Sequence, residues 1–141
     1  MTPDNRRAIE HDVEKIVLRF FHYLDGGDYD QLAGLFAADG VWHRQGKALR
    51  GPEAVLEAMH ARPAGMVTQH VASNIVVDAT DADHAEATLY LTVFAHAGAV
   101  PAQAPAPIEP PAQVGIYRER LVRTADGWRI GEITSLPKFR R

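Results

Sequence analysis

His70 is the side chain best placed for acid–base chemistry, because it lies within residues 66–78, a segment that is typical of a long β-strand. The segment is rich in β-branched residues and lacks glycine and proline. Strand alternation predicts a small, polar face made of Thr68, His70, Ala72 and Asn74. The opposite, apolar face is predicted to contain Val67, Val71, Ile75 and Val77. A neutral imidazole exchanges protons near neutral pH, so we predict that His70 is the acid or base of a ligand pocket.

Length and composition indicate one ordinary globular domain spanning residues 1–141. The chain has a mass of 15.5 kDa, which is enough to bury a core. Its net charge of −3 argues against nucleic-acid binding. Cysteine is absent, which excludes disulfides, a thiol nucleophile and Cys-type metal sites. The polar N-terminus and the lack of long apolar runs predict a cytoplasmic protein without a membrane span.

The first half of the chain predicts three helices that could hold the chemistry in place. Apolar residues recur at helical spacing over residues 5–24, and the glycine pair at 26–27 ends this helix. Asp28 suits the N-cap of a short second helix whose inward residues include Leu35 and Phe36. A short strand is expected at 41–44, then a tight connection over 46–51 and a third helix from Pro52 to Ala61.

The second half predicts about four long antiparallel strands. After the strand at 66–78, further strands are expected at 85–96, 114–124 and 128–136, and the first two form a hairpin. The proline-rich segment 98–112 is predicted to be a long loop. Helices segregated to one side of an antiparallel sheet define an α+β domain, in which a curved sheet around a helix leaves an open cavity.

Six short segments occur in an order that resembles the SnoaL-like branch of the NTF2-like superfamily. They are residues 23–30 (YLDGGDYD), 35–42 (LFAADGVW), 51–55 (GPEAV), 68–70 (TQH), 114–117 (VGIY) and 126–130 (DGWRI). The resemblance covers nearly the whole chain and implies a cone-shaped sheet wrapped around a long N-terminal helix. Since this fold hosts dehydratases, isomerases, epoxide hydrolases and non-catalytic subunits, it does not by itself define a reaction.

Within that superfamily the candidate catalytic residues resemble those of scytalone dehydratase and bacterial bile-acid dehydratases. Those enzymes pair an aspartate at the end of the first helix with a histidine on the first long strand, and Asp25 and His70 match these positions. The resemblance therefore implies that Asp25 orients and stabilises the His70 ring. His43 matches the position of a cavity tyrosine. The bile-acid enzymes have a tyrosine where Phe20 stands, and Tyr23 is the candidate to replace its phenol.

Each of these side chains also has a purely structural interpretation. Asp25 could make turn hydrogen bonds at the end of the helix, and His70 could be a satisfied sheet histidine. Tyr23 stands at core spacing with Phe20, which suits an amphipathic core residue. His43 could be a polar residue of an edge strand.

The favoured function is that of a cofactor-independent lyase, such as a dehydratase, or of an isomerase. Its substrate is expected to be a hydrophobic, aromatic or polycyclic hydroxylated small molecule, contacted by Phe20, Trp42, Asn74, Tyr90 and His96. The alternative is a non-catalytic ligand-binding or assembly subunit, similar to the small subunits of ring-hydroxylating dioxygenases. The histidine spacings typical of metal sites are absent, so no metal is expected. An outer apolar sheet face would need covering, which predicts a homodimer or higher homo-oligomer.

Overall fold

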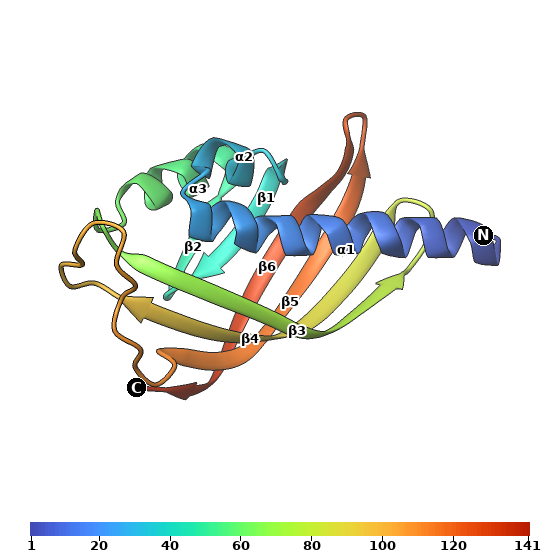
Figure 1. Ribbon diagram of the computed structural model, residues 1–141. Helices are drawn as coiled ribbons and strands as arrows, with labels where there is room; N and C mark the ends of the chain where they lie inside the picture. Colours follow the sequence, from blue (N-terminus) through green and yellow to red (C-terminus); the bar gives the residue numbers. More distant parts are fainter.

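The computed structural model describes residues 1–141 as three helices and one six-stranded sheet (Figure 1). The helices are α1 (Pro3–Gly26), α2 (Tyr29–Ala33) and α3 (Gly51–His60). The strands are β1 (Phe36–Arg44), β2 (Lys47–Arg50), β3 (Val67–Ala79), β4 (His84–His96), β5 (Gln113–Thr124) and β6 (Gly127–Arg140). The α+β architecture confirms the predicted fold class.

The sheet is mixed rather than purely antiparallel. Its strand order is β2-β1-β6-β5-β4-β3, and every neighbouring pair is antiparallel except β1 and β6. The parallel pair arises because β1 joins the far edge of the β3–β6 meander through a long connection, and only such a connection permits parallel pairing. Strands β2 and β3 are the two edges, so the curved sheet does not close into a barrel.

Helix α1 lies across the sheet and supplies one wall of the core (Figure 1). It begins where the Thr2 side chain accepts a hydrogen bond of 3.1 Å from the backbone N–H of Asn5. Its buried stripe consists of Ile9, Val13, Val17, Phe20, Phe21 and Leu24. It ends at Gly27, whose φ of 74° is a left-handed conformation that glycine adopts without strain.

Strand β3 changes the face that it buries at a β-bulge. The pairing with β4 shifts between Ser73 and Val76, and Asn74 within the bulge has a φ of 51°. The residues facing α1 and the core are Thr68, His70 and Ala72 before the bulge, then Ile75, Val77 and Ala79 after it. The prediction that Ile75 and Val77 share a face with Val67 and Val71 is therefore wrong, because one extra residue reverses the alternation.

Three boundaries differ from those expected. The second helix ends at Ala33, so Phe36 begins β1 instead of completing a helix. Residues 46–51 contain β2, which pairs with β1 through Val41 opposite Arg50. Strand β6 continues to Arg140 because β5 provides partners as far as Gln113. In each case the strand depends on a hydrogen-bonding partner elsewhere in the chain, which local sequence patterns do not reveal.

Residues 97–112 form the predicted loop between β4 and β5. The loop lies at the end of the molecule that also contains the start of β3 and the C-terminal end of α1 (Figure 1). The backbone N–H of Ala112 donates to Val93 at 2.7 Å, and Arg141 pairs with Glu109 at 2.9 Å. These contacts join the loop to β4 and to the end of the chain.

Candidate active site

Asp25 lies in the last turn of α1 and points toward the first residues of β3. Its carboxylate accepts three hydrogen bonds from two residues of that strand. The Thr68 hydroxyl donates to Oδ1 at 2.9 Å, the His70 backbone N–H donates to Oδ2 at 2.8 Å, and Nδ1 of His70 lies 2.6 Å from Oδ1. Asp25 thus joins the helix to the edge strand of the sheet.

The pKa of Asp25 is held below its usual range. Partial burial is the largest single influence and raises this pKa, because it disfavours the charged form. The hydrogen bonds from the His70 ring and backbone, the charge of His70 and the Thr68 hydroxyl together outweigh burial. Asp25 is consequently a carboxylate at neutral pH.

This carboxylate determines which nitrogen of His70 can act on a ligand. An ionised carboxylate only accepts hydrogen bonds, so Nδ1 of His70 holds a proton, and in the neutral ring the lone pair is on Nε2. The His70 ring stacks on Phe21, with centroids 5.7 Å apart and ring planes at 22°. Only 10 % of the His70 side chain is exposed, so its orientation is fixed by packing as well as by Asp25. The arrangement provides an oriented base that could become an imidazolium beside a negative charge.

Arg62 and Tyr117 extend this site, and no sequence pattern singled them out. Arg62 follows α3 and donates to the Thr68 hydroxyl at 3.3 Å, which places it beside the residue that binds Asp25. Tyr117 on β5 packs against Phe21 with ring centroids 5.7 Å apart. Burial, followed by the nearby Glu119 charge, raises the pKa of Tyr117 to about 12, so its phenol stays protonated. Tyr117 belongs to the quoted segment 114–117, but that segment indicates a strand and not a role.

The structure does not bring Tyr23 or His43 to Asp25 and His70. Residues two apart on a helix point about 200° away from each other, so Tyr23 packs on the opposite flank of α1 from Asp25. His43 neighbours the buried Trp42 on β1 and therefore faces the outer side of the sheet. There its Nε2 lies 2.9 Å from Glu132.

The five predicted substrate contacts also separate into different places. Phe20 and Trp42 are buried core residues whose rings meet edge to face at 5.1 Å. Asn74 is exposed in the β3 bulge, which removes it from the His70 face. Tyr90 is 51 % exposed, and it shares the outer face of β4 with His96, because the buried residues of β4 alternate with them. The sequence left the faces of Tyr90 and His96 open, since the hairpin register was not known.

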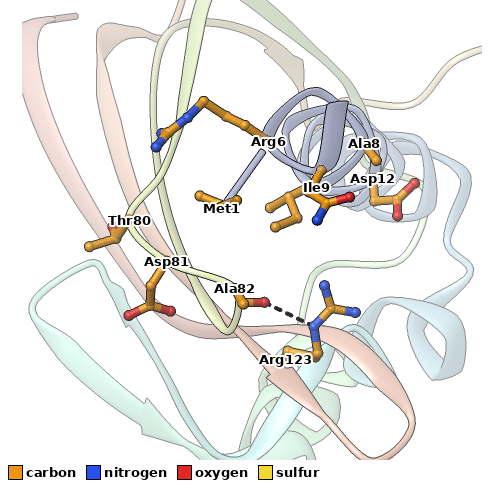
Figure 2. A pocket seen from close by; sticks show the side chains of 10 residues that line it. Met1, Arg6, Ala8, Ile9, Asp12, Thr80, Asp81, Ala82 and Arg123 are labelled. Carbon is orange, nitrogen blue, oxygen red and sulfur yellow. Dashed lines mark hydrogen bonds between the residues drawn. The ribbon is translucent and has the colours of Figure 1, made fainter. Parts of the chain in front are cut away.

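An open hollow of about 660 Å³ lies at the other end of α1 (Figure 2). It is lined by Met1, Asn5, Arg6, Ala8, Ile9, Asp12, Thr80, Asp81, Ala82 and Arg123. Asp12, the lining residue nearest to Asp25 in the sequence, is about 20 Å from it along the helix axis. This hollow is therefore separate from the site at His70.

Two further properties of the chain bear on the kind of site present. No group of three or more histidine or acidic side chains is arranged to hold a metal ion. None of the helices is both long and apolar enough to cross a membrane.

The sequence matches the model of a known protein family. The model of the SnoaL-like domain matches residues 5–134, and the chain therefore belongs to the SnoaL-like family of the NTF2-like superfamily. This confirms the resemblance inferred from the motifs. A search of curated proteins finds no match to the sequence.

Three solved structures illustrate the shared fold. A scytalone dehydratase-like protein from Novosphingobium aromaticivorans has a TM-score of 0.77 at 18% identity, covering 98% of this chain and 89% of its own. An NTF2-like protein with a cystatin-like fold from the same organism has a TM-score of 0.73 at 19% identity, covering 93% and 83%. A hexachlorocyclohexane dehydrochlorinase, LinA type 2, has a TM-score of 0.79 at 14% identity, covering 98% and 90%. Identities this low establish a common fold and not a common reaction.

Proposed function

We propose that this protein is a cofactor-independent lyase, such as a dehydratase, or an isomerase, that uses His70 as its acid–base residue. The observation that supports this most strongly is the 2.6 Å contact between Nδ1 of His70 and Oδ1 of Asp25, within a carboxylate fixed by two further hydrogen bonds. Its substrate is a hydroxylated aromatic or polycyclic molecule with an acidic C–H bond.

In the dehydration, Nε2 of His70 takes a proton from a carbon next to a carbonyl or phenol. The electron pair of the broken C–H bond forms a new C=C bond, and the C–O bond of the neighbouring hydroxyl group breaks. The imidazolium returns its proton to the departing hydroxyl, which leaves as water. Asp25 stabilises the imidazolium between these steps, and an isomerase would return the proton to a different carbon.

The names of two structural neighbours agree with this reaction type. Dehydration and dehydrochlorination both remove a C–H proton and an adjacent leaving group. That common chemistry, on the same fold, favours an elimination over the assembly role that the scaffold also permits.

The test is turnover of a panel of hydroxylated aromatic and steroid substrates by matched histidine variants. His70→Ala is expected to lower kcat by about a thousandfold, because general acid–base catalysis contributes on the order of 10² to 10⁴. His84→Ala is the control, since His84 also contacts an aspartate but lies on the surface. Circular dichroism would verify that both variants fold. Equal activity of His70→Ala and the parent protein would refute the proposal.

We also propose that the outer sheet face mediates homodimer formation. Val67, Val71 and Val76 are exposed on β3, and Tyr90 is exposed beside them on β4. An apolar patch of this kind is typical of an interaction surface. Light scattering should give twice the chain mass, and Val76→Glu should halve it without altering the circular dichroism spectrum; a monomeric parent protein would refute this.

A further inference from the structure

Two half-buried arginines have no carboxylate partner, and one of them, Arg62, is joined to Asp25 through the Thr68 hydroxyl. Arg44 is the last residue of β1, and Arg62 follows α3. Four other arginines form ion pairs with acidic side chains, whereas none of the seven ion pairs of the structure includes Arg44 or Arg62. Partly buried charges normally have such partners, because removing them from water is costly.

Arg62 is held in place entirely by neutral acceptors. Its guanidinium donates to the backbone carbonyl of Leu24 at 3.2 Å, to the Tyr29 hydroxyl at 3.1 Å and to the Thr68 hydroxyl at 3.3 Å. These bonds orient the group without neutralising it. The Thr68 hydroxyl in turn donates to Asp25, so only one side chain stands between Arg62 and the catalytic carboxylate.

Arg44 lies on the same face of β1 as the buried Trp42, which is the face turned toward the core. Its guanidinium lies over the Trp42 ring at 5.6 Å from the centroid, a contact that supports a planar cation without removing its charge. The pKa of Arg44 is lowered, first by burial and then by the positive charge of Arg62, while Tyr117 and Tyr29 act in the opposite direction. The two cations and the two phenols are therefore neighbours, and the two cations repel each other.

We propose that Arg44 and Arg62 together bind a carboxylate group of the substrate, so that the molecule on which His70 acts is a hydroxylated aromatic or alicyclic acid. A guanidinium presents a planar set of donors that matches the two oxygens of a carboxylate. An anion between the two cations would remove their repulsion. This inference rests on the proposed function for the position of the reacting carbon, but the anion site itself does not require catalysis.

The experiment is calorimetric titration of the 141-residue chain with four carboxylates and their uncharged amides. The probes are benzoate, 1-naphthoate, 2-naphthoate and cyclohexanecarboxylate, each compared with the amide of the same skeleton. At least one carboxylate is expected to bind about tenfold or more tightly than its amide, the effect of losing a charge-assisted hydrogen bond. If no carboxylate binds better than its amide, the proposal is wrong.

Arginine variants then locate the binding site. Arg44→Gln should weaken carboxylate binding about tenfold while leaving amide binding unchanged, and Arg44→Lys should restore part of the loss. Arg62→Gln should act in the same direction, but it also removes contacts to Leu24 and Tyr29, so Arg44 is the decisive position if that variant fails to fold. Arg118→Gln is the matched control, since Arg118 is exposed and has no ion pair. Equal losses in Arg44→Gln and Arg118→Gln would refute the site.

His70→Ala separates this inference from the proposed function. It should retain the preference for carboxylates, because His70 is not one of the two cations. If His70→Ala keeps both its preference for carboxylates and full turnover, the acid–base role is refuted and the anion site is supported. Lost turnover in His70→Ala, with no preference for carboxylates over amides in either protein, would refute the anion site and support the acid–base role.

Discussion

The chain contains two histidine–aspartate pairs that share the same chemistry and differ in their surroundings. His70 and Asp25 are 2.6 Å apart, and their side chains are 10 % and 22 % exposed. His84 and Asp81 are 2.9 Å apart at the β3–β4 turn, and their side chains are 61 % and 57 % exposed. Residue type and hydrogen-bonding distance alone would make the two pairs equivalent candidates.

The difference lies in what orients each pair. Asp25 and His70 come from elements far apart in the sequence, and Thr68 and Phe21 hold them from two sides. His84 and Asp81 are three residues apart, and water surrounds the ring, so side-chain rotation and solvent screening weaken the contact. A histidine–aspartate pair thus becomes a candidate catalytic pair through burial and long-range positioning.

The largest expected effect is that of the aspartate on turnover. Asp25→Asn should lower kcat on the order of a thousandfold, because an amide can donate to Nδ1 and favour the wrong tautomer of His70. Asp81→Asn should leave kcat within twofold. Steady-state kinetics on the best substrate of the panel would measure both. Similar rates for the two variants would remove the distinction between the pairs.

A third acidic residue shows what burial does to a carboxylate that has no hydrogen-bonding partner. Glu119 is 2 % exposed, and neither of its carboxylate oxygens has a hydrogen-bond partner. Burial alone raises its pKa to about 8, in contrast to the lowered pKa of Asp25. The pKa of Glu119 is near 4.5 in the unfolded state and about 8 in the folded state. At pH values between these two, the folded state therefore binds more protons than the unfolded state. Stability due to this group must fall as pH rises through that window.

Glu119→Gln should remove this dependence. From pH 5 to pH 9 the parent protein should lose on the order of 3 kcal/mol more unfolding free energy than the variant. Urea denaturation at several pH values would measure the difference. Parallel pH profiles would mean that Glu119 is solvated or paired in solution.

A smaller effect is expected from the hydroxyl that supports Asp25. Thr68→Val keeps the shape and strand preference but removes the donor to Asp25 and the acceptor for Arg62, which should lower kcat about tenfold. Thr88→Val on the exposed face of β4 is the matched control and should leave kcat unchanged. A full-activity Thr68→Val enzyme would show that Asp25 is positioned without this bond.

The smallest effect concerns acid stability. Because folding lowers the pKa of Asp25, its carboxylate stabilises the folded state fully above the unfolded value near 3.8, and this stability is lost as pH falls through the folded pKa. The stability advantage of the parent protein over Asp25→Asn should therefore be about 1 kcal/mol at pH 6 and shrink as the pH falls below 3.8. Thermal unfolding of both proteins across that range would measure it. An advantage independent of pH would contradict the assigned charge state.

Much of the fold could be predicted because it follows from local patterns. The helical spacing of α1, the glycine pair after it and the β-branched run of β3 all indicate their elements without partners. The bulge at Asn74, the strand β2 and the parallel β1–β6 pair could not, since each depends on hydrogen bonds to distant residues. The bulge had the largest consequence, because it reassigned Ile75 and Val77 to the core.

The candidate site could likewise be predicted only where local patterns or the family resemblance indicated its residues. Strand alternation and the family resemblance together indicated Asp25 and His70, and the structure brings these two side chains into contact. Arg62 and Arg44 have no spacing that distinguishes them from surface arginines, so only tertiary structure places them nearby. His43 and Tyr23 were predicted to be site residues from their motif positions alone. The alternation of β1 and the helical periodicity of α1 place their side chains away from Asp25 and His70.

The most direct test of the central claim is the protonation pattern of the His70 ring in solution. Long-range ¹H–¹⁵N correlation spectra at neutral pH distinguish a protonated ring nitrogen from one with a free lone pair. For the neutral ring we predict a protonated Nδ1 and an unprotonated Nε2, and this pattern should be lost in Asp25→Asn. A proton on Nε2 in the parent protein would contradict the account, because His70 would then have no base to offer a substrate.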